Sequence, residues 1–243
     1  MRTRLFLFLL IVSLGFGCRK QDVVGNKDYK TLGSSAHDLL SASAYTSLVV
    51  QFDYVQGYEP DATTISNLQS FLSSRLNKPD GIQFTMKQMP STGKSKVAIE
   101  DVVNLEKQNR SEFTIGSREA IHILIVDANY TTDNVIGISY WNTSICLFGP
   151  MIASHSGGIG QVSRPRLLSA VTEHEFGHLL GLVDQGTPMQ SDHKDAGHGA
   201  HCTNTSCLMY YGLESNSNFS SLINGLPALD ANCINDLRAN GGK

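Results

Sequence analysis

Residues 121–126 read Ile-His-Ile-Leu-Ile-Val (IHILIV), an apolar run of strand length that is rich in β-branched side chains. Such a run is typical of a central strand buried on both faces of a sheet. Working outward from it, strand patterns precede it at 47–55 and 82–89 and follow it at 135–140 and 145–148. These five segments predict one sheet with residues 121–126 near its centre.

Helix patterns alternate with the first strands. Asp61 or Thr63 can cap a helix whose apolar face carries Ile65, Leu68, Leu72 and Leu76. A second amphipathic helix spans 97–109, and a third begins near Arg164-Pro165, where proline suits the first turn. The order predicts an α/β (α+β) fold: a mixed, mostly parallel sheet, two packed helices and a further helix, followed by an irregular C-terminal part of long loops.

Bulk composition narrows the class of protein. The chain has 243 residues, 41% hydrophobic and 17% charged, which suits one compact domain with a substantial core. A formal charge of −3 provides no basic field, so we expect no nucleic-acid partner. Five cysteines in this length do not indicate a disulfide-dense scaffold.

The N-terminus has the composition of an export signal. Arg2 and Arg4 precede the apolar run 5–12, which is far shorter than the ~20 residues of a membrane span. Small residues before Cys18 resemble a bacterial lipobox, although Gly15 stands where such boxes usually carry Leu, Val or Ile. We favour a lipoprotein over plain secretion or an uncleaved anchor.

This interpretation divides the chain into three parts. Residues 1–17 are expected to be a signal peptide, and the polar segment 18–46 a tether attached to outer-membrane lipid through Cys18. The folded domain is then 47–243, with an N-terminal subdomain (47–181) and a C-terminal subdomain (182–243). The expected location is the bacterial cell envelope, in the outer membrane or at the cell surface.

Residues 174–178 (HEFGH) carry the most informative chemistry. On a helix, His174 and His178 project from one face about one turn apart and can fill two corners of a zinc tetrahedron. Glu175 then lies beside the metal-bound water and can act as its general base. The alternative is a helix with two ordinary core or surface histidines.

The longer run 174–184 (HEFGHLLGLVD) resembles the metzincin signature HExxHxxGxxH/D, and 207–211 (CLMYY) resembles the methionine turn of that clan. The chain is also similar to bacteroidete membrane-associated metalloproteases. The resemblance implies a metzincin-like fold, one catalytic Zn²⁺ and endopeptidase activity. It also implies that Gly181 ends the motif helix and that Met209 packs beneath the metal.

Two residues compete as the third zinc ligand. Asp184 occupies the strict position, as in snapalysin-like enzymes that use aspartate. His201, however, begins the segment 201–209, which resembles the archaemetzincin pattern HC-x4-C-x-M, whose histidine is the ligand. We favour His201 because neutral imidazole suits zinc; the other residue could orient a ligand imidazole.

The loop between these candidates holds His193, Asp195 and His198. It can be a polar surface loop, part of a second metal site for zinc or calcium, or the source of a different third ligand. Archaemetzincins complete a cysteine zinc site with a later CxxC, but here only Cys233-x-x-Asp236 occurs, so no four-thiolate site is expected.

The cysteines leave several pairings open in an exported protein. Cys202 and Cys207 are close enough in sequence for a disulfide that would stiffen the methionine turn. Other pairings, including Cys146 with Cys233, remain possible from sequence alone.

Further residues are candidates for substrate contact. Tyr211 coincides with the position where astacin-like enzymes place a tyrosine beside zinc, from which it could hydrogen-bond an oxyanion, or it is a packed aromatic. Strand 137–142 could form the upper rim of a cleft that binds extended peptide, with Tyr140 and Trp141 either lining the rim or lying in the core.

These features predict an exported zinc endopeptidase that hydrolyses protein or peptide substrates, with Glu175 and Tyr211 as catalytic residues. The alternatives are a non-catalytic zinc-binding surface lipoprotein and a metal-dependent amidase acting on cell-wall peptide. Retention of Glu175 favours an enzyme, because a structural zinc site needs no general base.

Overall fold

The computed structural model describes residues 27–214 and 219–243. Its main sheet has five strands in the order β2-β1-β4-β7-β6. Four strands are parallel, namely β1 (Ser47–Val55), β2 (Ile82–Met89), β4 (Arg118–Val126) and β7 (Ser144–Phe148), and β6 (Gly137–Trp141) is antiparallel at one edge. The predicted mixed, mostly parallel sheet is therefore confirmed, with the IHILIV run in the middle strand.

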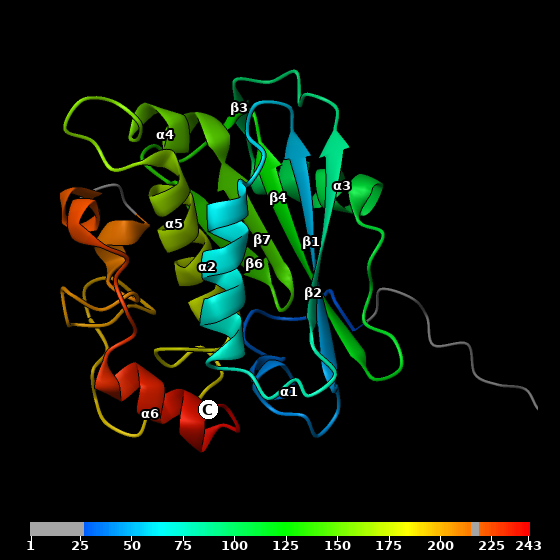
Figure 1. Cartoon of the computed structure of the whole chain (residues 1–243), viewed down its shortest axis with the longest axis vertical. Coiled ribbons are helices and arrows are strands. Elements are labelled where there is room, and N and C mark those ends of the chain that lie inside the picture. The colour runs from blue at the N-terminus through cyan, green and yellow to red at the C-terminus, as the bar shows by residue number, and fades with distance from the viewer. Residues whose placement is uncertain (1–26, 215–218) are drawn as a thin grey trace, which may run out of the picture.

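Helices cover both faces of this sheet (Figure 1). Helix α2 (Ala62–Ser73) packs on α5 (Arg164–Leu179) over one face, while α3 (Ile99–Asn109) lies against the other. Asp61 caps α2, as one of the two predicted caps, because its Oδ1 accepts a hydrogen bond from the Thr64 amide at 2.9 Å.

Strand β4 is buried on both faces, as the apolar run predicts. Ile121, Ile123 and Ile125 belong to the core beneath α2 and α5, whereas Leu124 and Val126 belong to the core on the α3 side. The period-two alternation of a strand accounts for this division, because successive side chains point to opposite faces.

The other elements are short and lacked a distinct sequence pattern. They are α1 (Ala36–Leu40), β3 (Lys96–Val97) paired with β5 (Asn129–Tyr130), α4 (Gly149–Ser154), η1 (Tyr211–Leu213), η2 (Phe219–Asn224) and α6 (Ala231–Ala239). The chain after α5 is mostly irregular, and Figure 1 shows it lying beside α5 with α6 at its lower end.

The N-terminal segment differs from the expected tether. Residues 27–46 pack onto the domain: Leu39 and Leu40 are fully buried, and the Asn142 amide donates to the Lys27 carbonyl at 2.9 Å. The packed chain thus begins before residue 47. Residues 1–26, with the expected signal peptide and Cys18, lie outside the described residues.

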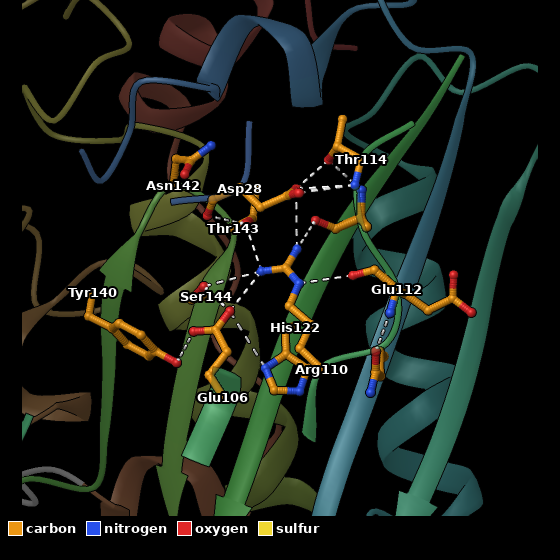
Figure 2. Close-up of polar contacts among 12 residues, drawn as sticks. Asp28, Glu106, Arg110, Glu112, Thr114, His122, Tyr140, Asn142, Thr143 and Ser144 are labelled. Atoms are coloured by element: carbon orange, nitrogen blue, oxygen red, sulfur yellow. Dashed lines mark hydrogen bonds and ion pairs between the residues drawn. The ribbon is translucent and has the colours of Figure 1, made fainter. Parts of the chain in front are cut away.

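A buried ionic cluster fastens this segment to the sheet (Figure 2). The Arg110 guanidinium lies 2.7 Å from a Glu106 carboxylate oxygen and 3.2 Å from Asp28, and all three side chains are fully buried. His122, the polar residue of the apolar run, approaches Asp53 to 2.7 Å. Arg110 gives the buried Glu106 and Asp28 carboxylates a cationic partner, which offsets the cost of taking these charges out of water.

Over residues 27–214 and 219–243, no helix is long and apolar enough to cross a membrane.

Candidate metal centre

Helix α5 positions the first two candidate ligands. His174 and His178 lie on one buried face, with ring centroids 4.9 Å apart. The helix ends at Leu179, and Gly181 follows with φ of +72°, a left-handed conformation that favours glycine at a helix end. Gly177 also has a steric role, since a methyl group there would lie 2.2 Å from Met209 Sδ. The methionine turn therefore packs directly against the motif helix.

The irregular C-terminal part supplies a third histidine. The His201 ring centroid lies 5.3 Å from that of His174 and 5.1 Å from that of His178. With the Glu214 carboxylate, each histidine offers one ligand atom within 4.8 Å of the others. These distances suit a group that surrounds a single metal ion.

Hydrogen bonds leave ring nitrogens free to bind a cation. His174 Nδ1 donates to the Leu208 carbonyl at 2.7 Å and His201 Nδ1 donates to the His198 carbonyl at 2.6 Å. Because a carbonyl only accepts, each neutral ring keeps its lone pair on Nε2. Both Nε2 atoms, and His178 Nδ1, are buried without a hydrogen-bond partner among the described residues. This donor set fits a metal ion.

Electrostatics favours neutral, metal-competent imidazoles on α5. Burial, reinforced by the neighbouring histidines, lowers the pKa of His174 to about 4 and that of His178 to about 3. For His201, burial acts in the same direction, but the Glu214 carboxylate and the His198 carbonyl outweigh it and raise the pKa. The two helix histidines are therefore deprotonated at neutral pH.

Glu214 is the member of the cluster that the sequence did not indicate. Its Oε2 lies 2.9 Å from His201 Nε2, although the two atoms are not aligned as a hydrogen bond. Burial opposes ionisation of this carboxyl, but the three imidazoles lower its pKa to about 2. No motif spacing links Glu214 to the helix, so only the folded chain brings it to the histidines.

The structure places Asp184 outside this group. Its φ is +66°, its side chain is 62% exposed, and its Oδ2 pairs with Lys194 Nζ at 2.9 Å. The irregular turn after Gly181 directs the carboxylate toward solvent. Asp184 therefore neither joins the three histidines nor orients one of them, in contrast to the strict metzincin spacing.

Glu175 lies on the buried side of α5, facing edge strand β6. Ser139 Oγ is 2.8 Å from both Glu175 Oε2 and the Glu175 carbonyl oxygen, and its hydroxyl can donate to either. Glu175 Oε1 is buried and has no hydrogen-bond partner among the described residues. Burial, followed by repulsion from Glu214, raises the pKa of Glu175 well above its usual value. Ser139 is a second residue of the candidate site that no sequence motif indicated.

The side chains of the remaining loop candidates contact residues outside the group of three histidines. Tyr211 stacks face to face on His198, with ring centroids 3.6 Å apart and planes 1° apart. His198 Nδ1 in turn pairs with Asp195 Oδ2 at 2.7 Å on the surface. His193 is buried elsewhere, against Asp236. Neither His193 nor His198 therefore supplies the third member of the cluster.

A pocket of about 220 Å³ opens beside the cluster; its lining is Leu32, Ile138, Ser139, His178, Gln185, Ala200, His201 and Glu214. Strand β6 borders it, in agreement with the expected rim.

Tyr140 and Trp141, the two aromatic residues considered for the rim, do not line this pocket. The Tyr140 hydroxyl donates to Glu106 in the ionic cluster (Figure 2), and the Trp141 ring packs on Tyr29 at 4.5 Å. They are packing residues here, and the register of β6 is irregular between Ser139 and Trp141.

None of the disulfide pairings that the sequence left open is formed among the described residues, whose four cysteines are all free. Cys146 lies in the core on the α3 side, whereas Cys233 belongs to the other core, so this pair cannot form. Cys207 Sγ lies 3.7 Å from Cys233 Sγ and is not bonded to Cys202.

Comparison with known proteins supports the fold. No family model matches the sequence, and the search of curated proteins finds no match. Among solved structures, the chain is similar to the crystal structure of archaemetzincin from Methanopyrus kandleri, with a TM-score of 0.53 and 13% sequence identity. The match covers 82% of this chain and 96% of that one. The protein therefore has an archaemetzincin-like fold.

Proposed function

We propose that the protein is a zinc-dependent endopeptidase whose catalytic ion is held by His174, His178 and His201. One observation carries this proposal: three buried imidazoles converge with unpartnered nitrogens within one group of metal-competent side chains. Glu175, which follows His174 on the helix, is close enough to this group for its carboxyl to be repelled by that of Glu214. We assign Glu214, 2.9 Å from His201 Nε2, to the support of that ligand rather than to the fourth position. Three histidines with the fourth position left to water are typical of catalytic rather than structural zinc. When bound, zinc polarises the scissile carbonyl and activates a water molecule.

Glu175 is proposed as the general base and acid. In this role the carboxylate accepts a proton from water and returns it to the leaving amine. The Ser139 hydroxyl, 2.8 Å from Oε2, holds this carboxylate in one orientation. Ser139 is thus a positioning residue.

The proposed substrate is an extended segment of protein or peptide. Strand β6 lies at the edge of the described sheet, and Ile138 and Ser139 of this strand line the pocket. An edge strand can pair with an extended peptide through main-chain hydrogen bonds. This arrangement favours peptide-bond cleavage over an amidase specific for cell-wall peptide.

Export and lipidation at Cys18 remain proposals that rest on the sequence. They suit an enzyme that acts on extracellular or envelope proteins.

Peptide-library cleavage by the purified protein tests the activity. We expect cleavage that a chelator abolishes and zinc restores, and that Glu175→Gln removes while the bound metal is kept. The matched control is Asp184→Asn, which should cleave normally because Asp184 faces solvent. Equal cleavage by the wild type and Glu175→Gln would refute the proposal. If neither protein cleaves any peptide, with or without chelator, a non-catalytic zinc lipoprotein is favoured.

Zinc stoichiometry tests the ligand set separately. His201→Ala should lose the catalytic ion, whereas Asp184→Ala should keep it. The reverse result would assign the third position to the aspartate.

A further inference from the structure

The N-terminal segment reaches the candidate metal centre. Leu32 is half-buried and packs against the core, and it lines the same pocket of about 220 Å³ as His178, His201 and Glu214. Residues 27–46 therefore contribute to the candidate active site as well as to the fold, although their polar composition is typical of a tether.

Leu32 is held between two parts of the chain that border the pocket. On one side, Asn142, which follows β6 and is fully buried, accepts a hydrogen bond from the Lys30 amide at 2.7 Å. On the other side, Gly33 packs closely on the turn after α5, since a methyl group there would lie 1.5 Å from the Gln185 backbone oxygen. These contacts fix the backbone before and after Leu32, so its side chain is a fixed part of the pocket wall.

The pocket lining combines two kinds of side chain. Its apolar members come from the N-terminal segment, strand β6 and the loop before His201, and they are Leu32, Ile138 and Ala200. Its polar members include three of the candidate metal-binding residues, namely His178, His201 and Glu214. A peptide whose carbonyl oxygen reaches the metal would therefore have a neighbouring side chain within reach of apolar surface.

Size limits what this pocket accepts. Pockets for whole small-molecule ligands measure about 300–1,000 Å³. At about 220 Å³ the present pocket suits one side chain and the adjoining peptide unit. An aliphatic side chain is favoured there, because contact with Leu32, Ile138 and Ala200 removes its apolar surface from water.

We infer that this pocket is the subsite for an aliphatic substrate side chain next to the scissile bond, and that Leu32 is a specificity-determining residue. The inference rests on the proposed endopeptidase function and names the class of peptide to be cleaved. Such a peptide carries leucine, or a residue of similar shape, beside the cleaved bond.

A basic side chain is the competing candidate, since Glu214 brings a carboxylate to the pocket. Its Oε2 lies 2.9 Å from His201 Nε2, within the group that would surround the ion, so it is committed to that ligand. A lysine or arginine would also bring a second positive charge close to the metal ion. The lining therefore favours an aliphatic side chain over a basic one.

Paired peptides test the inference through a ratio. The starting peptide is one that the purified protein cleaves, and leucine, alanine or lysine is placed in turn at each of the two residues that flank the cleaved bond. At one of these positions the wild type should prefer leucine to alanine by about 10-fold or more in kcat/KM, as expected for an apolar pocket. Both peptides are measured on one sample, so their ratio does not depend on the fraction of protein that is folded.

Substitution of Leu32 should change this ratio in opposite ways. Leu32→Ser removes apolar contact and should lower the preference for leucine about 10-fold, whereas Leu32→Trp fills the pocket and should produce a preference for alanine. The matched control is Thr31→Ser, at an exposed neighbour outside the lining, which should leave the ratio unchanged. The same ratio in the wild type and both Leu32 variants, or a wild-type preference for lysine over leucine, would overturn the inference.

A binding measurement separates this inference from the proposed function, because it needs no turnover. Acetohydroxamate and isocaprohydroxamate chelate zinc through the same group and differ only in the length and branching of the aliphatic chain. The zinc-loaded wild type should bind isocaprohydroxamate about 10-fold or more tightly, and Leu32→Ser should remove most of this difference.

The two failures have different signatures. Equal affinity of the wild type for both hydroxamates, or binding of neither, would overturn the subsite even if the protein cleaves peptides. The expected difference in affinity without cleavage of any peptide would refute the endopeptidase function and support an aliphatic-binding pocket beside the metal.

Discussion

Alanine at position 177 is expected to destabilise the protein, although alanine is normally the better helix former. In an ordinary helix interior the change from glycine stabilises by about 1 kcal/mol. Here the new methyl group would lie 2.2 Å from Sδ and 3.0 Å from Cε of the fully buried Met209. Forcing an extra carbon into a packed core costs about 1–3 kcal/mol, so we expect Gly177→Ala to be less stable by up to ~2 kcal/mol.

A double-mutant cycle isolates the contact. Met209→Ala alone should cost about 2–5 kcal/mol because it leaves a cavity. In that background the obstruction is gone, so Gly177→Ala should become stabilising through its helix propensity and partial filling of the cavity. The expected coupling is about 1–3 kcal/mol. The effect of one substitution therefore changes sign with the residue it faces.

Urea denaturation followed by circular dichroism measures the free energy of unfolding of the wild type, the two single variants and the double variant. Each protein is measured once with zinc in excess and once with chelator. Working under both conditions separates packing from metal binding. If Gly177→Ala stabilises both backgrounds equally, the two residues are not coupled and the steric role of Gly177 is refuted.

Three further predictions concern the N-terminal segment, a buried acid and the metal cluster. Gly33→Ala should cost more than ~3 kcal/mol in urea denaturation, because φ is +77° and a methyl would lie 1.5 Å from a backbone oxygen. The matched control Gly57→Ala, with φ of +91° and no described atom within 4 Å of the methyl, should cost only ~1–2 kcal/mol; equal losses would contradict the packing of residues 27–46. Burial raises the pKa of Glu119 from 4.5 to about 8, despite Lys78 nearby. The neutral acid therefore stabilises the fold fully below pH 4.5, and this contribution is lost as pH rises through about 8. Glu119→Gln should thus match the wild type near pH 5 and exceed it by on the order of 3 kcal/mol at pH 9, and a pH-independent difference would contradict the raised pKa. Glu214→Gln should weaken zinc binding about 10-fold or more in a chelator competition, and unchanged affinity would show that this carboxylate does not support the metal.

Local patterns account for most of the sheet. Strands 47–55 and 82–89 were predicted with the bounds that the structure has, because alternation and β-branched composition are read over a few neighbouring residues. The apolar run 121–126 likewise predicted a strand with two buried faces. Here it extends back to Arg118, since pairing with β1 continues to that residue.

The N-terminal segment is where sequence reasoning failed. Residues 27–46 are polar and aperiodic, so they resemble a tether. Asp28 is nevertheless fully buried because Arg110, far along the chain, supplies a buried partner. A polar residue in the core is stable only with such a partner, and composition does not reveal partners distant in sequence.

The residues of the candidate site also fall into two groups, those that a local pattern predicts and those that only tertiary contacts bring together. The sequence by itself determined His174, Glu175 and His178, because the geometry of one helix fixes residues that are four apart on a common face. Only the tertiary structure decided between Asp184 and His201, brought Glu214 to the cluster and gathered His193 beside Cys202 and Cys233. Those choices depend on how irregular loops fold back over α5 and α6, where long-range packing and hydrogen bonds, rather than any repeating local pattern, set the position of each side chain.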